Sequence, residues 1–278
     1  MMLFVKELTA LDVSLWCPRR GLVGASYHID VELEGELGED GMLFDFGEVK
    51  PWIKSRIDDS LDHTLLVPTK APGVEIEECR EGLRLRTRSP WSLEMRAPRQ
   101  AYSLLPWANI SIERLETYLS HELSRRPPPR VAQIRVTLRE EVIEGAGYTY
   151  SHGLRRHRGN CQRIAHGHRS RLAIHHNGKR SPVLEQRWAQ RLDDIYLADR
   201  EDIVRQHSER CRIAYDAPQG HFVIELPGER VEILPSTTTV ECIADWIASE
   251  SAALVGGHVQ VQAFEGIDKG AVAAARSA

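Results

Sequence analysis

The sequence predicts an α+β fold made of two tandem units, each an antiparallel sheet with helices on one face. At about 150 residues per domain, 278 residues suffice for two units, and a hydrophobic content of 42% can give each unit a core. The expected elements of the first half also recur in the same order in the second half. Leu105-Pro106 corresponds to Leu234-Pro235, and Ile134 and Val136 correspond to Val259 and Val261 at nearly the same offset.

The elements of the first half follow from alternation and capping signals. Tyr27, Ile29, Val31 and Leu33 share one face of an extended chain, which predicts a strand. Asp45 is a suitable N-cap for a helix whose apolar positions run on to Leu61. Two short strands are expected near 74–87 and 91–96, then a helix over 110–123 and a strand around 134–138.

The second half is predicted in the same way. Two strands are expected within 148–174, a helix over 184–204, a hairpin from 211–215 and 222–226, a helix over 240–254 and a last strand over 259–263. Each unit would then have the order strand, strand, helix, helix, strand, strand. The expected boundary lies within 141–147, which gives units 1–143 and 144–278.

Composition excludes several classes of protein. Lys plus Arg is 36 and Asp plus Glu is 40, and this net charge of −4 is unusual for a protein that lives mainly on nucleic acid or an anionic membrane. No window approaches the run of about 18 apolar residues that spans a bilayer, and no secretion signal is expected because Glu7 interrupts the N-terminal apolar stretch. The five cysteines form no C-x-x-C pair, so a reducing cytoplasm is the expected compartment.

One segment of this acidic chain is cationic and rich in histidine. Six of the twelve histidines fall within 152–176, and residues 145–184 contain no Asp or Glu. Residues i and i+2 of a strand point to the same face, so His166 and His168 can present two imidazoles to one ion. His152 from a neighbouring strand would complete a three-nitrogen site with an open position, the arrangement of a catalytic zinc. The alternative is a solvated basic strand with incidental histidines.

Cys161 precedes this histidine pair by five residues. A thiol beside a bound cation and several arginines would have its thiolate favoured, which makes it a usable base or nucleophile. The alternative is a small buried hydrophobe, which is the interpretation given to the other four cysteines.

These residues bear a resemblance to a known family. Tyr150-Ser151-His152-Gly153-Leu154, Cys161 and His166-Gly167-His168 resemble the signature of 6-pyruvoyltetrahydropterin synthases and bacterial 6-carboxytetrahydropterin synthases. The resemblance implies the tunnelling fold, Zn2+ held by the three histidines and Cys161 as the catalytic base. It also implies a homo-oligomer in which units close into a barrel, with active sites where neighbouring units meet.

The segment 41–66 resembles the part of the family that carries an Asp-His pair, here Asp62 and His63, which assists the cysteine in proton transfer. The second half has Asp193-Asp194 at the corresponding place. Conversely, the first half has 16–18 and 27–29 where zinc histidines would be expected. The resemblance therefore implies one complete site, shared between the halves within one chain. A histidine at a helix C-terminus, interacting with the helix dipole, is the alternative for His63.

The segment 261–266 resembles the family motif whose glutamate anchors the pterin. A carboxylate at Glu265 could accept two parallel N–H bonds from the ring, whereas an ordinary exposed Glu is the alternative. Glu140 is its counterpart in the first half, where it would anchor nothing without a metal. Thr239 and Glu241 resemble a substrate-binding pair at a helix start, and helix capping explains them equally well.

The leading functional hypothesis is a zinc-dependent lyase that acts on 7,8-dihydroneopterin triphosphate or a related pterin, with arginines of the cationic segment on the triphosphate. A non-catalytic pterin- or purine-binding protein is the alternative, motivated by the four residues between Cys161 and His166. In a regular strand that spacing needs a bulge or loop if the thiol is to reach the metal. A nucleic-acid surface is disfavoured because only 6% of the residues are aromatic. The product, pyruvoyl or carboxy pterin, is left open.

Overall fold

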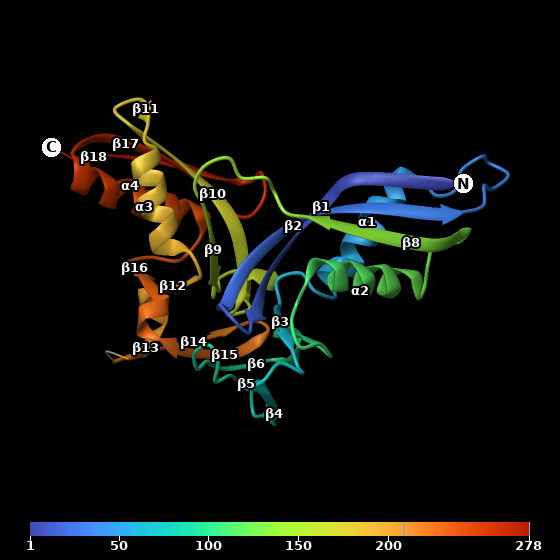
Figure 1. Cartoon of the computed structure of the whole chain (residues 1–278), viewed down its shortest axis with the longest axis horizontal. Coiled ribbons are helices and arrows are strands. Elements are labelled where there is room, and N and C mark those ends of the chain that lie inside the picture. The colour runs from blue at the N-terminus through green and yellow to red at the C-terminus, as the bar shows by residue number, and fades with distance from the viewer. Residues whose placement is uncertain (208, 278) are drawn as a thin grey trace.

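The computed structural model describes every residue except 208 and 278. In the first half, the chain forms β1 (Met2–Cys17), β2 (Gly21–Gly35), α1 (Phe46–Asp58), β3 (Leu65–Pro68), β4 (Glu75–Cys79), β5 (Gly82–Arg86), β6 (Glu94–Ala97), β7 (Tyr102–Leu105), α2 (Ile112–Ser124) and β8 (Val131–Arg139). Figure 1 shows this half extending to one side of the molecule, with α1 and α2 beside β1, β2 and β8.

The second half forms β9 (Gly147–His152), β10 (His166–His176), β11 (Lys179–Arg180), α3 (Pro182–Leu192), β12 (Ile195–Asp199), β13 (Ile203–Gln206), β14 (Arg210–Ala217), β15 (Gly220–Pro227), β16 (Val231–Leu234), α4 (Val240–Val255), β17 (Gly257–Phe264) and β18 (Gly270–Ser277). It extends to the other side in Figure 1. Apart from β11 and β18, each element has a counterpart in the first half.

Sheet topology confirms the internal repeat. One sheet has the order β7-β3-β1-β2-β8, and the other has the matching order β16-β12-β9-β10-β17 followed by β18. The long hairpins pair antiparallel, whereas the short strands β3, β7, β12 and β16 add in parallel at one edge. The sequence did not predict these short parallel strands, because four-residue segments carry too little periodicity to identify them.

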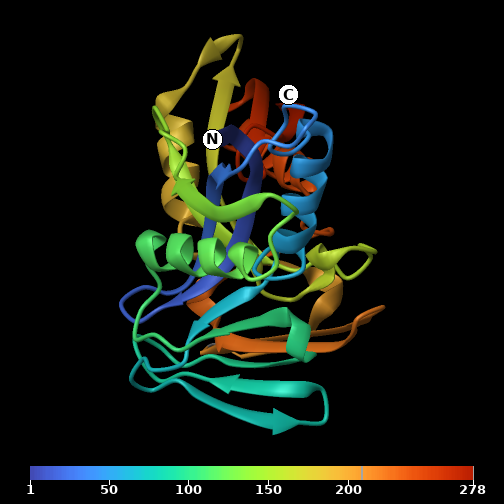
Figure 2. The ribbon, with the colours of Figure 1, turned by 90° about the vertical axis from the view of Figure 1, so that its right-hand side faces the viewer.

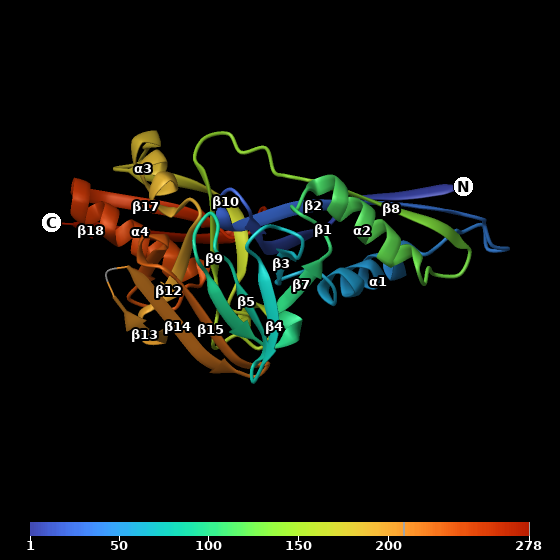
Figure 3. The same cartoon turned by 60° about the horizontal axis from the view of Figure 1, so that its bottom comes forward.

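The two repeats share a third sheet. Its order is β13-β14-β15-β6-β5-β4, so β15 of the second repeat pairs directly with β6 of the first, with Ile224 opposite Met95. Side chains from both repeats bury a common core beneath it, including Trp16, Leu85, Tyr196 and Phe222. Figure 3 brings this sheet forward, between the two halves. Because the sheet crosses the repeats, the boundary between residues 143 and 144 stays a prediction.

The long hairpins of the two repeats also cross at close range, around an approximate two-fold axis. Ser14 Oγ lies 2.7 Å from Ser151 Oγ, and these serines occupy equivalent places on β1 and β9. A Cβ atom at Gly24 would lie 2.1 Å from the carbonyl oxygen of Tyr150, and one at Gly167 would lie 2.9 Å from the Cα of Gly24. Only glycine allows these backbones to approach so closely. Figure 2 shows the crossing from the side.

We expect Gly24→Ala to lower the free energy of unfolding by about 3 kcal/mol, because a backbone rather than a flexible side chain must move to admit the methyl group. Urea denaturation measures the effect. Gly47→Ala is the matched control, since this exposed glycine lies in the first turn of α1, where alanine is favoured. Equal midpoints for the two variants would contradict the close crossing of the hairpins.

Helix boundaries follow from their caps. Asp45 Oδ1 accepts from Gly47 N at 2.6 Å, as the sequence predicted, and Ser111 and Thr239 cap α2 and α4. The second repeat corrects one prediction: the helix expected over 184–204 ends at Leu192. Asp194 adopts a φ of 58°, which reverses the chain, and the following buried residues 195–199 form β12 instead.

Two other strand predictions were incomplete. The segment expected as one short strand over 74–87 forms the hairpin β4–β5, with the turn at Gly82, whose φ is 134°. The strand predicted over 259–263, which is β17, is also not the last strand of the chain. A further strand, β18, follows it and pairs with β17 along the whole length of β17. Alternating small residues in 270–277 give a weak strand signal, which explains why the sequence did not reveal it.

Candidate functional site

The three predicted metal ligands lie side by side on β9 and β10. His166 pairs directly opposite His152 in the strand register, and His168 follows on the same face of β10. All three side chains are buried. Their rings lie close, with centroids 4.4 Å apart for His152 and His166 and 5.6 Å apart for His166 and His168. One ligand nitrogen from each lies within 4.8 Å of the others.

Two of the imidazoles are oriented by a hydrogen-bond acceptor at Nδ1, and the third lies beside a carboxylate. His152 Nδ1 donates to the carbonyl oxygen of Thr238 at 3.0 Å, and His166 Nδ1 donates to that of Arg163 at 3.0 Å. His168 Nδ1 lies 3.2 Å from Asp12 Oδ1. The three Nε2 atoms are buried and have no hydrogen-bond partner among the described residues. An acceptor on one nitrogen and a free second nitrogen is the pattern of metal-bound histidine.

The protonation state fits the same interpretation. Burial lowers the pKa of both His152 and His166 well below its usual value, and the neighbouring histidines add to the effect. These rings are therefore neutral at physiological pH, which is the form that binds a metal ion. A solvated basic strand, the alternative weighed from the sequence, would have exposed and unoriented rings.

Cys161 approaches this cluster from a loop. It lies in the short 3-10 turn Asn160–Gln162 between β9 and β10, and its carbonyl oxygen accepts from Leu154 N at 2.8 Å. Its thiol, a nitrogen of His63 and a nitrogen of His166 all lie within 4.8 Å of one another. The unusual spacing before His166 is thus absorbed by the loop rather than by a strand, where an extra residue would reverse the side chain.

Asp62 and His63 reach the same place from the first repeat, after α1. His63 Nδ1 donates to Asp62 Oδ2 at 2.5 Å, and the His63 ring centroid lies 5.2 Å from that of His166. Although burial opposes protonation, hydrogen bonds to Asp62 and Cys161 raise the pKa of His63 to about 10. His63 also has a φ of 54°, a conformation held by the bond from its N–H to the carbonyl of Asp12.

Asp12 is a site residue that sequence reasoning missed. Its carboxylate is buried and accepts from Ser26 Oγ at 2.5 Å and from Lys269 Nζ at 2.9 Å, besides lying next to His168. Burial would raise its pKa, but His168, Lys269 and Ser26 together hold that pKa well below its usual range. Asp12 is therefore a fixed negative charge behind His168. In sequence it is one polar residue in a long strand, with no motif around it.

Glu265 lies at the edge of the cluster. It follows β17, and its Oε1 is 4.0 Å from His168 Nε2, while the side chain is 24% exposed. Its backbone N–H donates to Lys269, which fixes the turn that also places Lys269 on Asp12. A carboxylate at the mouth of a buried imidazole cluster can accept hydrogen bonds from a ligand seated there.

Thr239 and Glu241 lie at the start of α4, and the capping role weighed for them from the sequence is the one observed for Thr239. Thr239 caps α4 through Cys242 N, and Glu241 is exposed in the first turn of that helix. No hydrogen bond or ion pair of Glu241 with the histidines occurs among the described residues. Thr238 is instead the threonine in contact, through both its carbonyl and its hydroxyl oxygen, with His152. A run of three threonines before the helix gave no reason to single out the middle one.

Much of the cationic segment is paired elsewhere. Arg155 and Arg156 bind Glu201, Arg171 binds Glu141, and Arg180 binds Glu185. These ion pairs neutralise charge that the sequence assigned to phosphate binding. Arg163 is the arginine nearest the site, since its guanidinium donates to the carbonyl of Asp62 at 3.3 Å and to Gln219.

The strand registers identify the first-repeat counterparts of the histidines. Leu15 pairs with Val23 on β1 and β2 as His152 pairs with His166, and the next inward position is Ala25. The sequence placed the segments 16–18 and 27–29 at these positions. The first begins one residue after Leu15, and the second begins four residues after Val23, so both are out of register. Asp193-Asp194 is confirmed as the counterpart of Asp62-His63, because Asp194 N donates to Thr149 as His63 N donates to Asp12.

Comparison with known proteins gives a consistent result. The family model described as 6-pyruvoyl tetrahydropterin synthase matches residues 17–149 and again residues 141–275. A Pyrococcus abyssi protein named "Putative 6-carboxy-5,6,7,8-tetrahydropterin synthase" is 30% identical over 122 residues, which cover 44% of this chain and 70% of that protein. A Methanocaldococcus jannaschii protein of the same name is 30% identical over 137 residues, covering 47% and 82%.

Solved structures give a partial match. A Plasmodium vivax 6-pyruvoyltetrahydropterin synthase carrying a catalytic-residue mutation superposes with a TM-score of 0.40 at 19% identity, covering 50% of this chain and 90% of that one. Among the described residues, no helix is both long and apolar enough to cross a membrane.

Proposed function

Because the chain belongs to the 6-pyruvoyl tetrahydropterin synthase family, we propose that it is a zinc-dependent lyase acting on 7,8-dihydroneopterin triphosphate or a closely related pterin. The observation that carries the proposal is the convergence of three free, buried Nε2 atoms beside Cys161 and His63. Three imidazole nitrogens with room for one more ligand are typical of a catalytic rather than a structural zinc site.

His152, His166 and His168 would hold the metal through their Nε2 atoms, which are buried and have no partner among the described residues. Acceptors already occupy Nδ1 of His152 and His166, and Nδ1 of His168 lies 3.2 Å from Asp12 Oδ1. When bound, Zn2+ would supply Lewis acidity toward oxygens of the substrate side chain. The buried charge of Asp12 behind His168 favours the cation and keeps that ring oriented.

Cys161 and His63 would move the proton. The thiolate form of Cys161 would take it from carbon, and His63, held by Asp62 at 2.5 Å, would stabilise that thiolate as its hydrogen-bond partner. Glu265 would fix the heterocycle by accepting its N–H groups. Direct contact of Thr239 and Glu241 with the substrate rests on the resemblance alone. Thr238 would have a separate role, which is to position His152 through its hydroxyl oxygen.

The direct test is turnover. We expect the purified, zinc-loaded chain to release triphosphate from 7,8-dihydroneopterin triphosphate, with one metal ion per chain by mass spectrometry. Identification of the pterin product distinguishes the pyruvoyl from the carboxy reaction. Binding of the pterin ring without triphosphate release would reject catalysis and leave the non-catalytic binding protein as the function.

We also propose a homo-oligomer in a reducing, cytoplasmic environment. Strands β8 and β18 end their sheets with unpaired edges in the described chain, and an exposed edge is relieved when it pairs with another copy. The five cysteines are free. Light scattering should give a multiple of 31.5 kDa. A monomer at micromolar concentration would contradict barrel closure by oligomerisation.

A further inference from the structure

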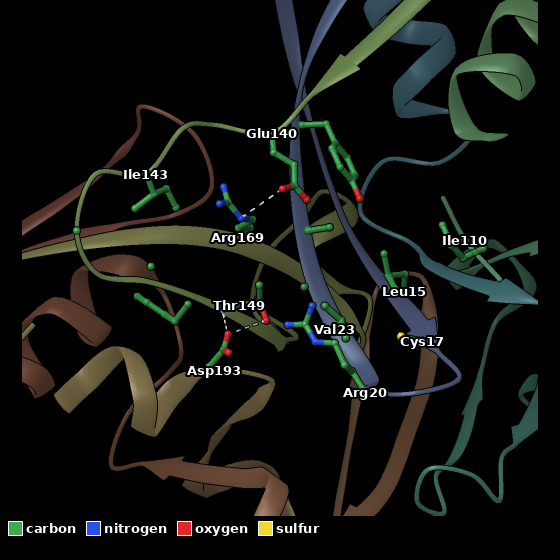
Figure 4. A pocket seen from close by; sticks show the side chains of 16 residues that line it. Leu15, Cys17, Arg20, Val23, Ile110, Glu140, Ile143, Thr149, Arg169 and Asp193 are labelled. Atoms are coloured by element: carbon green, nitrogen blue, oxygen red, sulfur yellow. Dashed lines mark hydrogen bonds and ion pairs between the residues drawn. The ribbon is translucent and has the colours of Figure 1, made fainter. Parts of the chain in front are cut away.

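A second pocket lies at the place related to the histidine site by the approximate two-fold axis. Its volume is about 500 Å³, and it is lined by side chains of both repeats (Figure 4). Backbone contacts fix the correspondence. Thr149 N donates to Asp193 Oδ1 at 2.9 Å, just as its first-repeat counterpart, Asp12 N, donates to Asp62 Oδ1 at 3.0 Å. The pocket is thus the counterpart of the candidate active site.

This pocket cannot hold a metal ion in the same way. Leu15, Val23 and Ala25 line it where the other site has three imidazoles, so its inner wall offers no nitrogen ligands. The counterpart of His63 is Asp194, and Asp194 is engaged in a two-pronged ion pair with Arg20 at 2.8 and 2.7 Å. The wall is therefore apolar and the rim is polar.

Among the rim carboxylates, Glu140 is the one with free acceptor capacity. It is the first-repeat counterpart of Glu265, since both follow the strand that pairs with the inner hairpin. Its nearest cation, Arg169 Nε, lies 3.9 Å away and its side chain is 47% exposed. Asp193, in contrast, already accepts from the backbone N–H and the hydroxyl of Thr149.

The charges around the pocket limit the ligand. Arg20 and Arg169 would repel a cation, and Glu140, Asp193 and Asp194 would repel a polyphosphate. An uncharged molecule with hydrogen-bond donors avoids both penalties. A flat ring can lie against the apolar wall of Leu15, Val23 and Ala25 while its N–H edge meets Glu140.

We propose that this pocket is a second, metal-independent binding site for a neutral heterocycle whose ring edge is a cyclic guanidine, with Glu140 accepting two of its N–H groups. A carboxylate recognises such an edge as it recognises a guanidinium group, through two parallel hydrogen bonds. The site would bind without reacting, since it offers neither a metal ligand set nor a thiol paired with histidine. The expectation from the sequence is the opposite, that Glu140 anchors nothing, and the binding experiment decides between the two.

The test is binding stoichiometry with a matched pair of probes. The choice of pterin as the probe rests on the proposed function. Lumazine is the control, because a carbonyl replaces its 2-amino group and the ring no longer offers two adjacent N–H donors to one carboxylate. We expect the full-length, chelator-treated protein to bind two pterins per chain by calorimetry, and lumazine to bind at neither carboxylate. Glu140→Gln should weaken one of the two pterin sites by about 10- to 100-fold.

Glu265→Gln should weaken the other site and leave the Glu140 site intact. Glu144→Gln is the matched control, since Glu144 is exposed near the pocket but does not line it. A single pterin per chain that is insensitive to Glu140→Gln would overturn the proposal, as would equal affinity for lumazine at this pocket. Absence of triphosphate release would instead refute the proposed lyase activity, so the two failures are distinguishable.

Discussion

His166→Ala is expected to abolish metal binding and reduce turnover by at least about 1000-fold. The ring of His166 lies 4.4 Å from that of His152 and 5.6 Å from that of His168, and its Nε2 is one of the three free nitrogens. Two remaining imidazoles leave a divalent ion without the three protein ligands that catalytic zinc sites use. Metal content per chain, measured by mass spectrometry after desalting, and triphosphate release check the two halves of the prediction.

His175→Ala provides the control. His175 lies on the same strand, β10, but on its other face, because it is an odd number of residues from His166. This variant should retain one metal ion and full turnover. Chelation of the unmodified chain should reproduce the loss seen with His166→Ala, and added Zn2+ should reverse it. Retention of metal by His166→Ala would show that the three histidines are not the ligand set.

The fold was largely predictable because repeats and caps are local or periodic signals. The helix that begins after Asp45, the hairpin of β14 and β15 and the order of the two repeats all follow from alternation, turn residues and matched landmarks. The shared sheet was not predictable, because the pairing of β6 with β15 joins segments more than a hundred residues apart and no local pattern encodes that partner.

The residues of the candidate site also fall into a group that the sequence predicted and a group that it did not. His152, His166 and His168 are marked by residue type and by spacing along a strand, and the sequence therefore predicted that they lie together. Asp12 and Thr238 contact the histidines through oxygen atoms, from positions that no motif marks in the sequence. Only the assembled structure shows that their oxygens face an imidazole. Contacts between a candidate metal-binding histidine and the oxygen beside its other ring nitrogen depend on tertiary placement rather than on a motif.

Cys161→Ala is expected to lower turnover by about 100- to 10,000-fold, the range for loss of a positioned acid or base, while metal content and pterin affinity stay unchanged. Cys79→Ala is the control, since Cys79 ends the edge strand β4 of the shared sheet. Single-turnover measurements separate the chemical step from binding. Unchanged turnover in Cys161→Ala would exclude its thiol as the base.

A double variant tests whether the thiol acts together with the histidine of the other repeat. The thiol of Cys161 and a ring nitrogen of His63 lie within 4.8 Å of each other, so the two side chains should function as one proton-transfer unit. Residues that act as a unit are strongly non-additive. We therefore expect the double variant, Cys161→Ala with His63→Ala, to have nearly the same turnover as the more impaired of the two single variants. Fully additive losses would show that the first repeat contributes independently of the thiol, and that its role lies in placing the substrate rather than in moving the proton.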